Sequence, residues 1–323
     1  MYFNYNLENF KNQEFLSEKK FKDYKRVSEF LSASYRRQKK YGKSFAVENC
    51  GTHLEFAVYE NGEKKLHSAN FCKVRLCPLC AWRRSLKIFS QVSRILDAFD
   101  NGCYSYLFLT LTVKNVDGNE LSVAIDKLLS GYKKLMKLKE FKVVEGSFRA
   151  LEVTFNKESL TYHPHIHCIL AVPNSYFKSH KYLSQKKISE LWGNVLSVDY
   201  DPRVDIRRFN RVDGREVAEV AKYAVKPNEY ILRDSNGDVI EGLTDEVVSV
   251  LDDALHGRRL ISFGGIFKKL HKELNLDDVE NGDLIIVDGE KVCNCSILYV
   301  EVYEWRSGVK EYVFVEKKIN DGG

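Results

Sequence analysis

Three histidines share one short segment of the chain, TYHPHIHCIL at residues 161–170. His163, His165 and His167 occupy every second position, so in a β-strand all three point toward the same face. Two neutral imidazoles two residues apart on a strand can chelate one divalent ion. The segment therefore predicts a metal site with His165 and His167 as ligands. His163, which precedes Pro164, is left open between a ligand and a neighbour of the ligands.

A catalytic metal site needs a third protein ligand and an open coordination position. Glu152 is an isolated carboxylate in the apolar segment FRALEVTFN at residues 148–156. A short polar loop joins this segment to the histidine segment, so a hairpin would bring Glu152 alongside. We expect Glu152 to be the third ligand. The alternative is a strand residue that simply faces solvent.

The segment EVAEVAKYAVK at residues 216–226 carries a carboxylate and a tyrosine four residues apart. In a helix, Glu219 and Tyr223 would lie one turn apart on the same face. A tyrosine hydroxyl can act as a covalent nucleophile, and a carboxylate can activate water. The plainer interpretation is a tyrosine packed at the edge of an amphipathic helix. Lys222 and Lys226 are candidates for phosphate contacts, or else belong to a solvated helix face.

Cysteines form a second group with metal-ligand spacing. Three of them follow the pattern C-x4-C-x2-C, and a fourth stands 22 residues earlier. A structural zinc ion takes four ligands, and we favour the set Cys50, Cys72, Cys77 and Cys80. His53 is the rival fourth ligand, and small buried thiols or redox chemistry are the alternatives. Arg83 and Arg84 follow the cluster and would suit DNA phosphates.

The elements that must position these residues alternate between strand and helix patterns. Strands are predicted at 105–113, 148–156, 162–172 and 203–210, and helices at 120–141, 186–196 and 214–225. The order β-α-β-β-α-β-α predicts an α+β fold with a ferredoxin/RRM-like antiparallel sheet and helices on one face. The histidines would lie on the open face. Outside this core we expect a helical segment at 17–41, hairpins at 53–71 and 297–316, and a helix at 81–99.

Charge is distributed unevenly along the chain. Residues 1–227 carry 39 Lys and Arg against 25 Asp and Glu, whereas residues 228–291 carry 7 against 15. The first two-thirds therefore suits a polyanionic partner, although an ordinary basic surface would give the same count. No apolar run reaches the roughly 20 residues of a membrane span, and the N-terminal sequence does not resemble a signal peptide. We expect a cytoplasmic protein.

Taken together and in order, the motifs resemble a known family. They are FLTLT (108–112), HPHIHCIL (163–170) and EVAKYAVK (219–226), accompanied by FCKVRLCPLCAWRRS (71–85) and RRLISFGGIFKKLHKELNLDD (258–278). The chain resembles the rolling-circle plasmid replication initiators of the Rep_1 family, part of the HUH endonuclease superfamily, from about residue 45 to residue 290. His165 and His167 match the family's metal-binding pair, Tyr223 its nicking tyrosine, and Glu219 the glutamate that releases product by hydrolysis.

The resemblance implies a function. A bacterial initiator of this kind would bind a supercoiled plasmid origin with an extruded hairpin and nick one strand with Mg²⁺ or Mn²⁺. Tyr223 would form a 5′-phosphotyrosyl link and leave a 3′-hydroxyl that primes synthesis. After one round, Glu219 and water would perform the last cleavage. A host helicase and a DNA polymerase would be partners, and no membrane would be involved.

The order of the motifs and the change to acidic composition after Asn228 suggest a division of the chain. We expect an N-terminal helical extension at 1–44, a four-cysteine zinc-binding module with a helix at 45–100, and a nicking domain of the HUH type at 101–228. The acidic region at 229–323 would recognise the origin or complete the fold.

Other functions fit part of the pattern. Another HUH enzyme, such as a relaxase or a single-tyrosine transposase, would share the histidines. A non-catalytic zinc-containing DNA-binding regulator would keep the cysteines and need no nucleophile. An ordinary metallohydrolase would not need Tyr223, so the substitution Tyr223→Phe discriminates between these classes.

Overall fold

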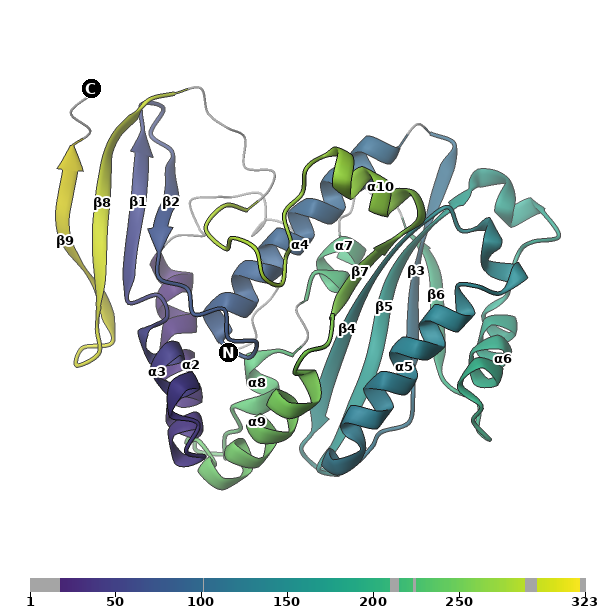
Figure 1. Cartoon of the computed structure of the whole chain (residues 1–323), viewed down its shortest axis with the longest axis horizontal. Helices are drawn as coiled ribbons and strands as arrows, with labels where there is room; N and C mark the ends of the chain where they lie inside the picture. Colours follow the sequence, from purple (N-terminus) through teal and green to yellow (C-terminus); the bar gives the residue numbers. More distant parts are fainter. Residues whose placement is uncertain (1–17, 101, 210–214, 223–224, 288–294, 320–323) are drawn as a thin grey trace. The chain divides into compact units, whose positions relative to one another are not determined.

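The computed structural model describes residues 18–100, 102–209, 215–222, 225–287 and 295–319 (Figure 1). The chain divides into two compact units, each assembled from separate stretches. Unit 1 is Met1–Ser90, Ile231–Val248 and Asp277–Gly323, and unit 2 is Gln91–Tyr230 and Ser249–Leu276. The predicted domains were consecutive segments. The structure differs because segments from beyond residue 228 belong to both units.

The sheet of unit 2 has five strands in the order β6-β3-β5-β4-β7, and every neighbouring pair is antiparallel. The strands are β3 (Tyr104–Thr112), β4 (Gly146–Asn156), β5 (Thr161–Pro173), β6 (Val204–Phe209) and β7 (Ile261–Gly264). The four strands predicted from the sequence are confirmed. The fifth, β7, comes from the acidic region and pairs with β4, so that region contributes to the fold.

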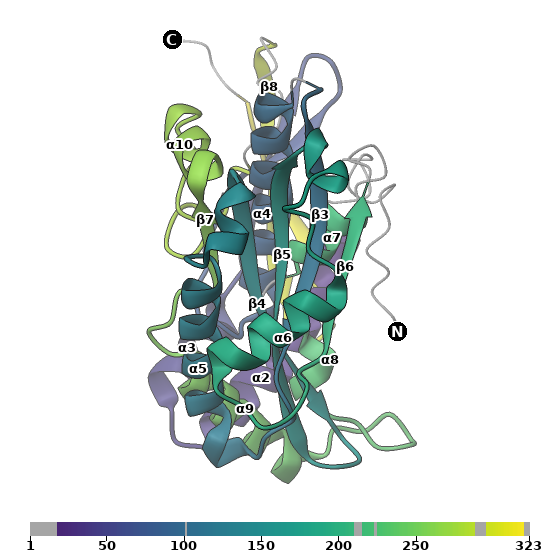
Figure 2. The same ribbon diagram turned by 90° about the vertical axis from the view of Figure 1, so that its right-hand side faces the viewer.

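Helices lie on both faces of this sheet. They are α5 (Leu121–Leu135), α6 (Gln185–Leu196), α7 (Arg215–Val220) and α10 (Gly265–Glu273). Figures 1 and 2 show α5 and α6 on one side of the strands and α7 on the other, where α7 contacts β5. The prediction that the histidines lie on an open face is therefore wrong in part. We call the side that His163, His165 and His167 point to the histidine face.

The packing of the opposite face follows from the amphipathic helices. Trp192 of α6 is fully buried, and its indole Nε1 donates to the carbonyl of Thr112 at 2.8 Å. Gly131 of α5 lets the two helices approach, because a Cβ there would meet Leu196 at 2.8 Å and Trp192 at 3.0 Å. This closely packed layer holds the strands that carry the histidines.

The sheet of unit 1 has four strands in the order β2-β1-β8-β9. They are β1 (His53–Tyr59), β2 (Lys64–Ala69), β8 (Ile297–Arg306) and β9 (Glu311–Ile319). Both predicted hairpins are confirmed, and the loop of the first ends with Gly62 in the left-handed region, at a φ of 81°, as a three-residue hairpin loop requires. The two hairpins pair with each other through β1 and β8, where His53 lies opposite Glu304.

Helices α2 (Glu18–Arg37) and α3 (Tyr41–Asn49) belong to unit 1, and α4 (Pro78–Phe99) begins in it. Phe21, Tyr24 and Leu31 of α2 recur at helical spacing and are buried, as an apolar helix face requires. The ring of Trp82 packs edge-on against Phe21 at 4.9 Å and is stacked on Tyr24 at 5.2 Å between centroids. None of the helices in the described part of the chain has the length and apolarity to span a membrane.

Candidate metal centre and catalytic site

The register of β4 and β5 brings the three predicted ligands together. Glu152 pairs with His165, and Ala150 pairs with His167. Side chains opposite each other across antiparallel strands share a face, so Glu152 points the same way as both imidazoles. The hairpin predicted from the sequence therefore produces the expected cluster.

The distances within the cluster suit one cation. Glu152 Oε2 lies 3.2 Å from His167 Nε2 and 3.6 Å from His165 Nε2. Glu152 and His167 are buried, and His165 is half-buried. An ion about 2.0–2.2 Å from one oxygen and two nitrogens would fit donors at this separation. The donor set of two imidazoles and a carboxylate is compatible with Mg²⁺, Mn²⁺ or Zn²⁺.

Hydrogen bonds orient the two imidazoles. His165 Nδ1 donates to the carbonyl of His163 at 3.1 Å, so a neutral His165 has its lone pair on Nε2. His167 Nδ1 lies 3.0 Å from Thr110 Oγ1 on β3. Partners of this kind fix the ring orientation of metal-binding histidines. Thr110 was not assigned a role from the sequence. The sequence did contain a signal for such a role, because Thr110 is a polar residue at the centre of the apolar strand FLTLT.

A lysine compensates the buried carboxylate. Lys226 Nζ lies 3.1 Å from Glu152 Oε1. Burial alone would raise the pKa of Glu152, but hydrogen bonds from His165 and His167 and the charge of Lys226 outweigh it and hold the pKa well below its usual value. Burial lowers the pKa of Lys226, but the nearby Glu152 carboxylate raises it by more. The pKa of Lys226 therefore lies above its usual value. The carboxylate is therefore kept ionised and ready to bind a cation.

Glu219 lies at the edge of this cluster. It belongs to α7, and its Oε1 is 4.0 Å from His167 Nε2, whereas its Oε2 forms a close ion pair with Lys222. Helix α7 ends at Val220 rather than at the predicted residue 225. Tyr223, the predicted nucleophile, lies outside the described residues. The structure thus brings Glu219, Lys222 and Lys226 toward the histidine face.

The cysteine cluster in unit 1 also forms as predicted. The Sγ atom of Cys50 lies 3.6 Å from that of Cys80 and 3.5 Å from that of Cys77, and Cys72 Sγ lies 3.8 Å from Cys80 Sγ. Four thiolates about 2.3 Å from a central Zn²⁺ would stand about 3.8 Å apart in a tetrahedron, so the set fits zinc. His53 is not part of the cluster, and its Nε2 lies 3.4 Å from Glu55 Oε1.

Comparison with known proteins gives the family. The Rep_1 family model, described as "Replication protein", matches residues 63–313. The chain belongs to the Rep_1 family. A "Protein rep" of Bacillus amyloliquefaciens is 40% identical over 308 residues, which cover 90% of this chain and 89% of that protein. A "Protein rep" of Streptococcus pneumoniae is 40% identical over 247 residues, or 74% of each chain. No solved structure matches the chain.

Two arginines of this Rep_1 chain have a structural role. Arg83 and Arg84 on α4 are buried, with 5% and 2% exposure. Arg83 Nε donates to the carbonyl of Leu284 at 2.8 Å, and Arg84 donates to the carbonyls of Lys73 and Glu280 at 2.7 and 3.2 Å. This contradicts the prediction that they contact DNA phosphates, because their donors already bond the chain.

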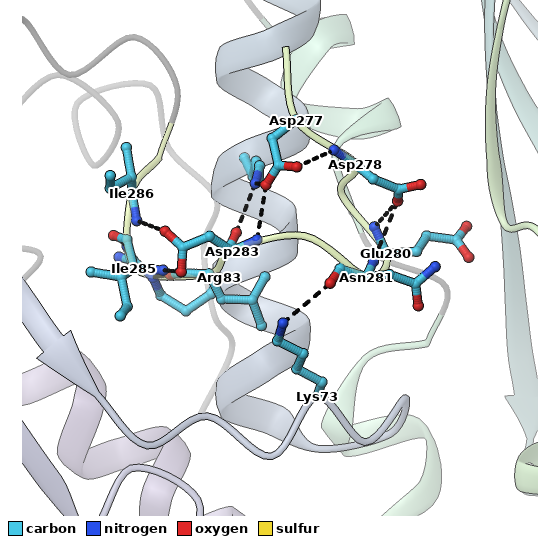
Figure 3. A network of polar contacts seen from close by, with 11 residues as sticks. Lys73, Arg83, Asp277, Asp278, Glu280, Asn281, Asp283, Ile285 and Ile286 are labelled. Atoms are coloured by element: carbon cyan, nitrogen blue, oxygen red, sulfur yellow. Dashed lines mark hydrogen bonds and ion pairs between the residues drawn. The ribbon is translucent and has the colours of Figure 1, made fainter. Parts of the chain in front are cut away.

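Two of these acceptors, Leu284 and Glu280, lie in an acidic loop of unit 1, which Figure 3 shows against α4. Asp277 accepts from the buried Lys87 Nζ at 2.6 Å and from the backbone N–H of Asp283 at 2.8 Å. Asp283 accepts in turn from the N–H groups of Ile285 and Ile286. The acidic residues of this loop thus order its own backbone and neutralise a buried lysine.

His163 remains beside the cluster rather than within it. Its ring is 5.3 Å from that of His165, and the group of Glu152, His165 and His167 converges without it. His163 lines an open cavity of about 500 Å³ with residues of β4 and of the loop that follows it. Its imidazole can therefore contact a ligand that approaches the metal centre from this side.

Proposed function

We propose that this Rep_1 protein initiates rolling-circle replication of a plasmid by nicking one DNA strand at the double-strand origin. The observation that carries the proposal is the convergence of Glu152, His165 and His167 on one face, with Glu219 at their edge. An ordinary structural metal site would be closed by a fourth ligand. Three ligands, with an acid and two lysines around them, are suited to a phosphodiester.

Glu152, His165 and His167 would hold Mg²⁺ or Mn²⁺, and Cys50, Cys72, Cys77 and Cys80 would hold a structural Zn²⁺. When bound in unit 2, the divalent ion supplies Lewis-acid polarisation of the scissile phosphate. The hydrogen bonds to His163 and Thr110 keep both imidazoles oriented with Nε2 toward the ion.

In the first step, the Tyr223 hydroxyl attacks the phosphorus and loses its proton. A bond forms between the tyrosine oxygen and phosphorus, and the bond from phosphorus to the 3′ oxygen breaks. The leaving 3′ oxygen takes up a proton, which gives a 5′-phosphotyrosyl link and a free 3′-hydroxyl. Phosphoryl transfer depends mainly on positioning and charge stabilisation. Lys222 and Lys226 would offset the negative charge of the phosphate.

In the last step, the nick site regenerated by synthesis would be cut again, and Glu219 would accept a proton from the water molecule that attacks its phosphorus. The bond from this phosphorus to the 3′ oxygen breaks and leaves a free 3′-hydroxyl. That hydroxyl would then attack the phosphotyrosyl phosphorus, so that the bond to tyrosine breaks, Tyr223 recovers a proton and the displaced strand is joined. Support comes from the position of Glu219, 4.0 Å from His167 Nε2 and about one-third exposed. A general base must lie within hydrogen-bonding reach of the water molecule that it deprotonates.

We further propose that unit 2 is an HUH-type nicking domain. The five-stranded antiparallel sheet with the histidine pair on its central strand supports this assignment. The protein would act on supercoiled plasmid DNA in the bacterial cytoplasm, and a host helicase and polymerase would extend the 3′-hydroxyl. Part of the acidic region completes the two sheets, and the rest of it would be available for origin recognition.

The test uses supercoiled DNA of the replicon that carries this gene, with purified protein and either Mn²⁺ or Mg²⁺. We expect open circles and a protein band that retains DNA through denaturation. Tyr223→Phe should abolish both. Glu219→Ala should still nick and form the adduct but fail in the hydrolytic cleavage that ends the round.

Tyr106→Phe is a matched control, since it removes a tyrosine hydroxyl from strand β3 of the same unit and should leave the adduct intact. Specific binding to the plasmid without a nick in either metal would contradict the enzyme assignment. Nicking that persists in Tyr223→Phe would indicate a metallohydrolase instead.

A further inference from the structure

A lysine-rich segment follows β5 and is unrelated to the metal ligands. Residues 174–187, NSYFKSHKYLSQKK, contain four lysines and no Asp or Glu. The segment comprises η4 (Asn174–Lys178), a connecting loop and the start of α6. Lys178, Lys181 and Lys186 are exposed. Such a concentration of one charge is unfavourable for the folded protein on its own, and it suits an anionic partner.

This segment runs along the edge strand of the unit 2 sheet. The guanidinium of Arg208, near the end of β6, lies 4.9 Å from the ring centroid of Phe177 in η4. Just before the strand begins, Arg203 lines a cavity of about 540 Å³ together with Lys186 and the acidic residues Glu190 and Asp201. The lysines of the segment and the arginines in and beside β6 therefore form one surface. We call it the basic belt, and its members are Lys178, Lys181, Lys186, Arg203, Arg207 and Arg208.

The charges of the belt are accessible and largely uncompensated. All six side chains belong to exposed residues. Among the described residues, Arg207 is the one belt member that forms an ion pair. Its Nε lies 3.8 Å from Glu216 Oε1. Lys187, which we leave out of the belt, pairs with Glu190 at 3.2 Å. Exposed cations gathered at one sheet edge are available to bind phosphates.

The belt reaches the histidine face through Arg207. Its guanidinium lies 4.8 Å from the ring centroid of Phe108 on β3. The ring of Phe108 in turn lies 5.4 Å from that of His167. A polyanion bound along β6 would therefore extend toward the metal centre, and only one aromatic ring separates the last arginine from a metal ligand.

We propose that the basic belt binds the phosphate backbone of duplex DNA and holds the double-stranded arm of the origin beside the nick site. The inference rests on the proposed nicking function. Proteins that bind single strands rely on exposed aromatic side chains that stack on bases, whereas the belt segment exposes one, Tyr182, at 53%. Residues 203–208, along β6, span about 17 Å, which corresponds to about five phosphates of one strand in a duplex.

The belt variant Lys178→Gln, Lys181→Gln, Lys186→Gln tests this assignment. The probe is a 30-base-pair duplex of mixed sequence, titrated at several salt concentrations. Loss of three phosphate contacts should weaken binding roughly 10- to 100-fold at 150 mM salt and lower the slope of log K against log salt by about 2.7. Because the three lysines are exposed, the variant should fold, and its thermal unfolding midpoint checks this.

The matched control removes the same charge from the opposite edge of the sheet. Lys268, Lys269 and Lys272 are exposed on α10, which follows β7. Their replacement by Gln should leave the salt slope near that of the wild type. An equal loss of duplex affinity in both variants would show that the belt contributes only positive charge that any surface lysines could supply, and it would overturn the proposal. An unchanged salt slope in the belt variant would also overturn it.

A second measurement separates the belt from the chemistry. We expect the belt variant to cleave a single-stranded oligonucleotide that spans the mapped nick site at the wild-type rate, and to nick supercoiled plasmid poorly at 150 mM salt. If single-strand binding and cleavage fall as much as duplex binding, the belt belongs to the single-strand site and the duplex assignment is wrong. If the wild type forms no adduct, the nicking function fails, while the duplex titration still tests the belt.

Discussion

The two candidate metal clusters of this protein differ in how much room they leave for chemistry. In unit 1, four sulfur atoms surround one position, and Cys50, Cys77 and Cys80 are completely buried. In unit 2, two imidazoles and one carboxylate converge, and His165 is half-buried. Glu219 and two lysines lie around the second cluster, and no described carboxylate or imidazole completes it as a fourth ligand.

The surroundings of the clusters differ in the same sense. Lys25 Nζ donates to the carbonyl of Cys50 at 2.7 Å, and the Tyr312 hydroxyl donates to the carbonyl of Gly51 at 2.5 Å. These bonds connect the cysteine cluster to α2 and to the C-terminal hairpin. The histidine cluster is instead surrounded by titratable groups at a surface. A closed set of four ligands is typical of structural metal sites, and an open set of three is typical of catalytic ones.

The largest effect is expected from opening the closed cluster. Cys77→Ser should remove zinc and unfold unit 1, because structural zinc sites contribute about 10 kcal/mol of folding free energy. Metal analysis and thermal unfolding measure both consequences. Cys103 is an exposed cysteine of unit 2, and Cys103→Ser should keep one zinc per chain. If the protein without zinc unfolded at the same temperature as the protein with zinc, the cysteine cluster would not be needed for stability. The two clusters would then not differ in the way described.

Removal of a ligand from the open cluster should affect activity far more than folding. We expect His167→Ala to reduce nicking by at least about 100-fold, since even the partners of metal ligands are worth 10- to 100-fold. The thermal unfolding midpoint should move by only a few degrees. His180→Ala, at an exposed position, should nick normally. A variant that unfolds like Cys77→Ser would show that the histidine cluster is structural as well.

A smaller effect should follow from the hydroxyl that orients His167. Thr110→Val keeps the side-chain shape and removes the contact at 3.0 Å, so Mn²⁺ affinity should fall about 10-fold. Calorimetric titration with Mn²⁺ measures it. Thr112 lies on the same face and bonds the carbonyl of Arg203 instead, so Thr112→Val should bind Mn²⁺ as the wild type does. Equal affinities in all three proteins would exclude a role for Thr110.

The smallest effect concerns pH in the metal-free protein. The pKa of Glu152 is lower in the folded state than its ordinary value of 4.5, so its ionisation stabilises the fold above that pH. This stabilisation is lost as pH falls through the lowered pKa, and a tenfold difference in proton affinity between the two states corresponds to about 1.4 kcal/mol. Denaturant unfolding between pH 7 and pH 3 should show a steeper acid limb for the wild type than for Glu152→Gln. Parallel curves would mean that the pKa of Glu152 is the same in the folded and unfolded states, and a shallower acid limb for the wild type would mean that burial outweighs ion pairing.

Local sequence patterns predicted most of the elements correctly. The hairpin around Asn61-Gly62 and the strand pair of β4 and β5 follow from alternation and short turns, which act over a few residues. For the same reason the Glu152–His165 pairing was accessible: once the hairpin is placed, register fixes which side chains share a face. The C-x4-C-x2-C spacing likewise indicated the cysteine cluster.

Predictions that depended on distant segments succeeded less well. Arg83 and Arg84 look like DNA contacts in sequence, but their acceptors are carbonyls about 200 residues away. The strand β7 and its pairing with β4 were missed, and so was the pairing of β1 with β8. Helix α7 is shorter than its periodicity predicted.

The ligand types, their spacing, the strand and helix periods and the uneven charge can all be read from the sequence. Which charges remain exposed, and which segments far apart in the chain share a sheet, became visible only in the folded structure. The physical reason is that periodicity and turn chemistry are local, whereas burial of an arginine or pairing of an edge strand depends on partners that the local sequence does not contain.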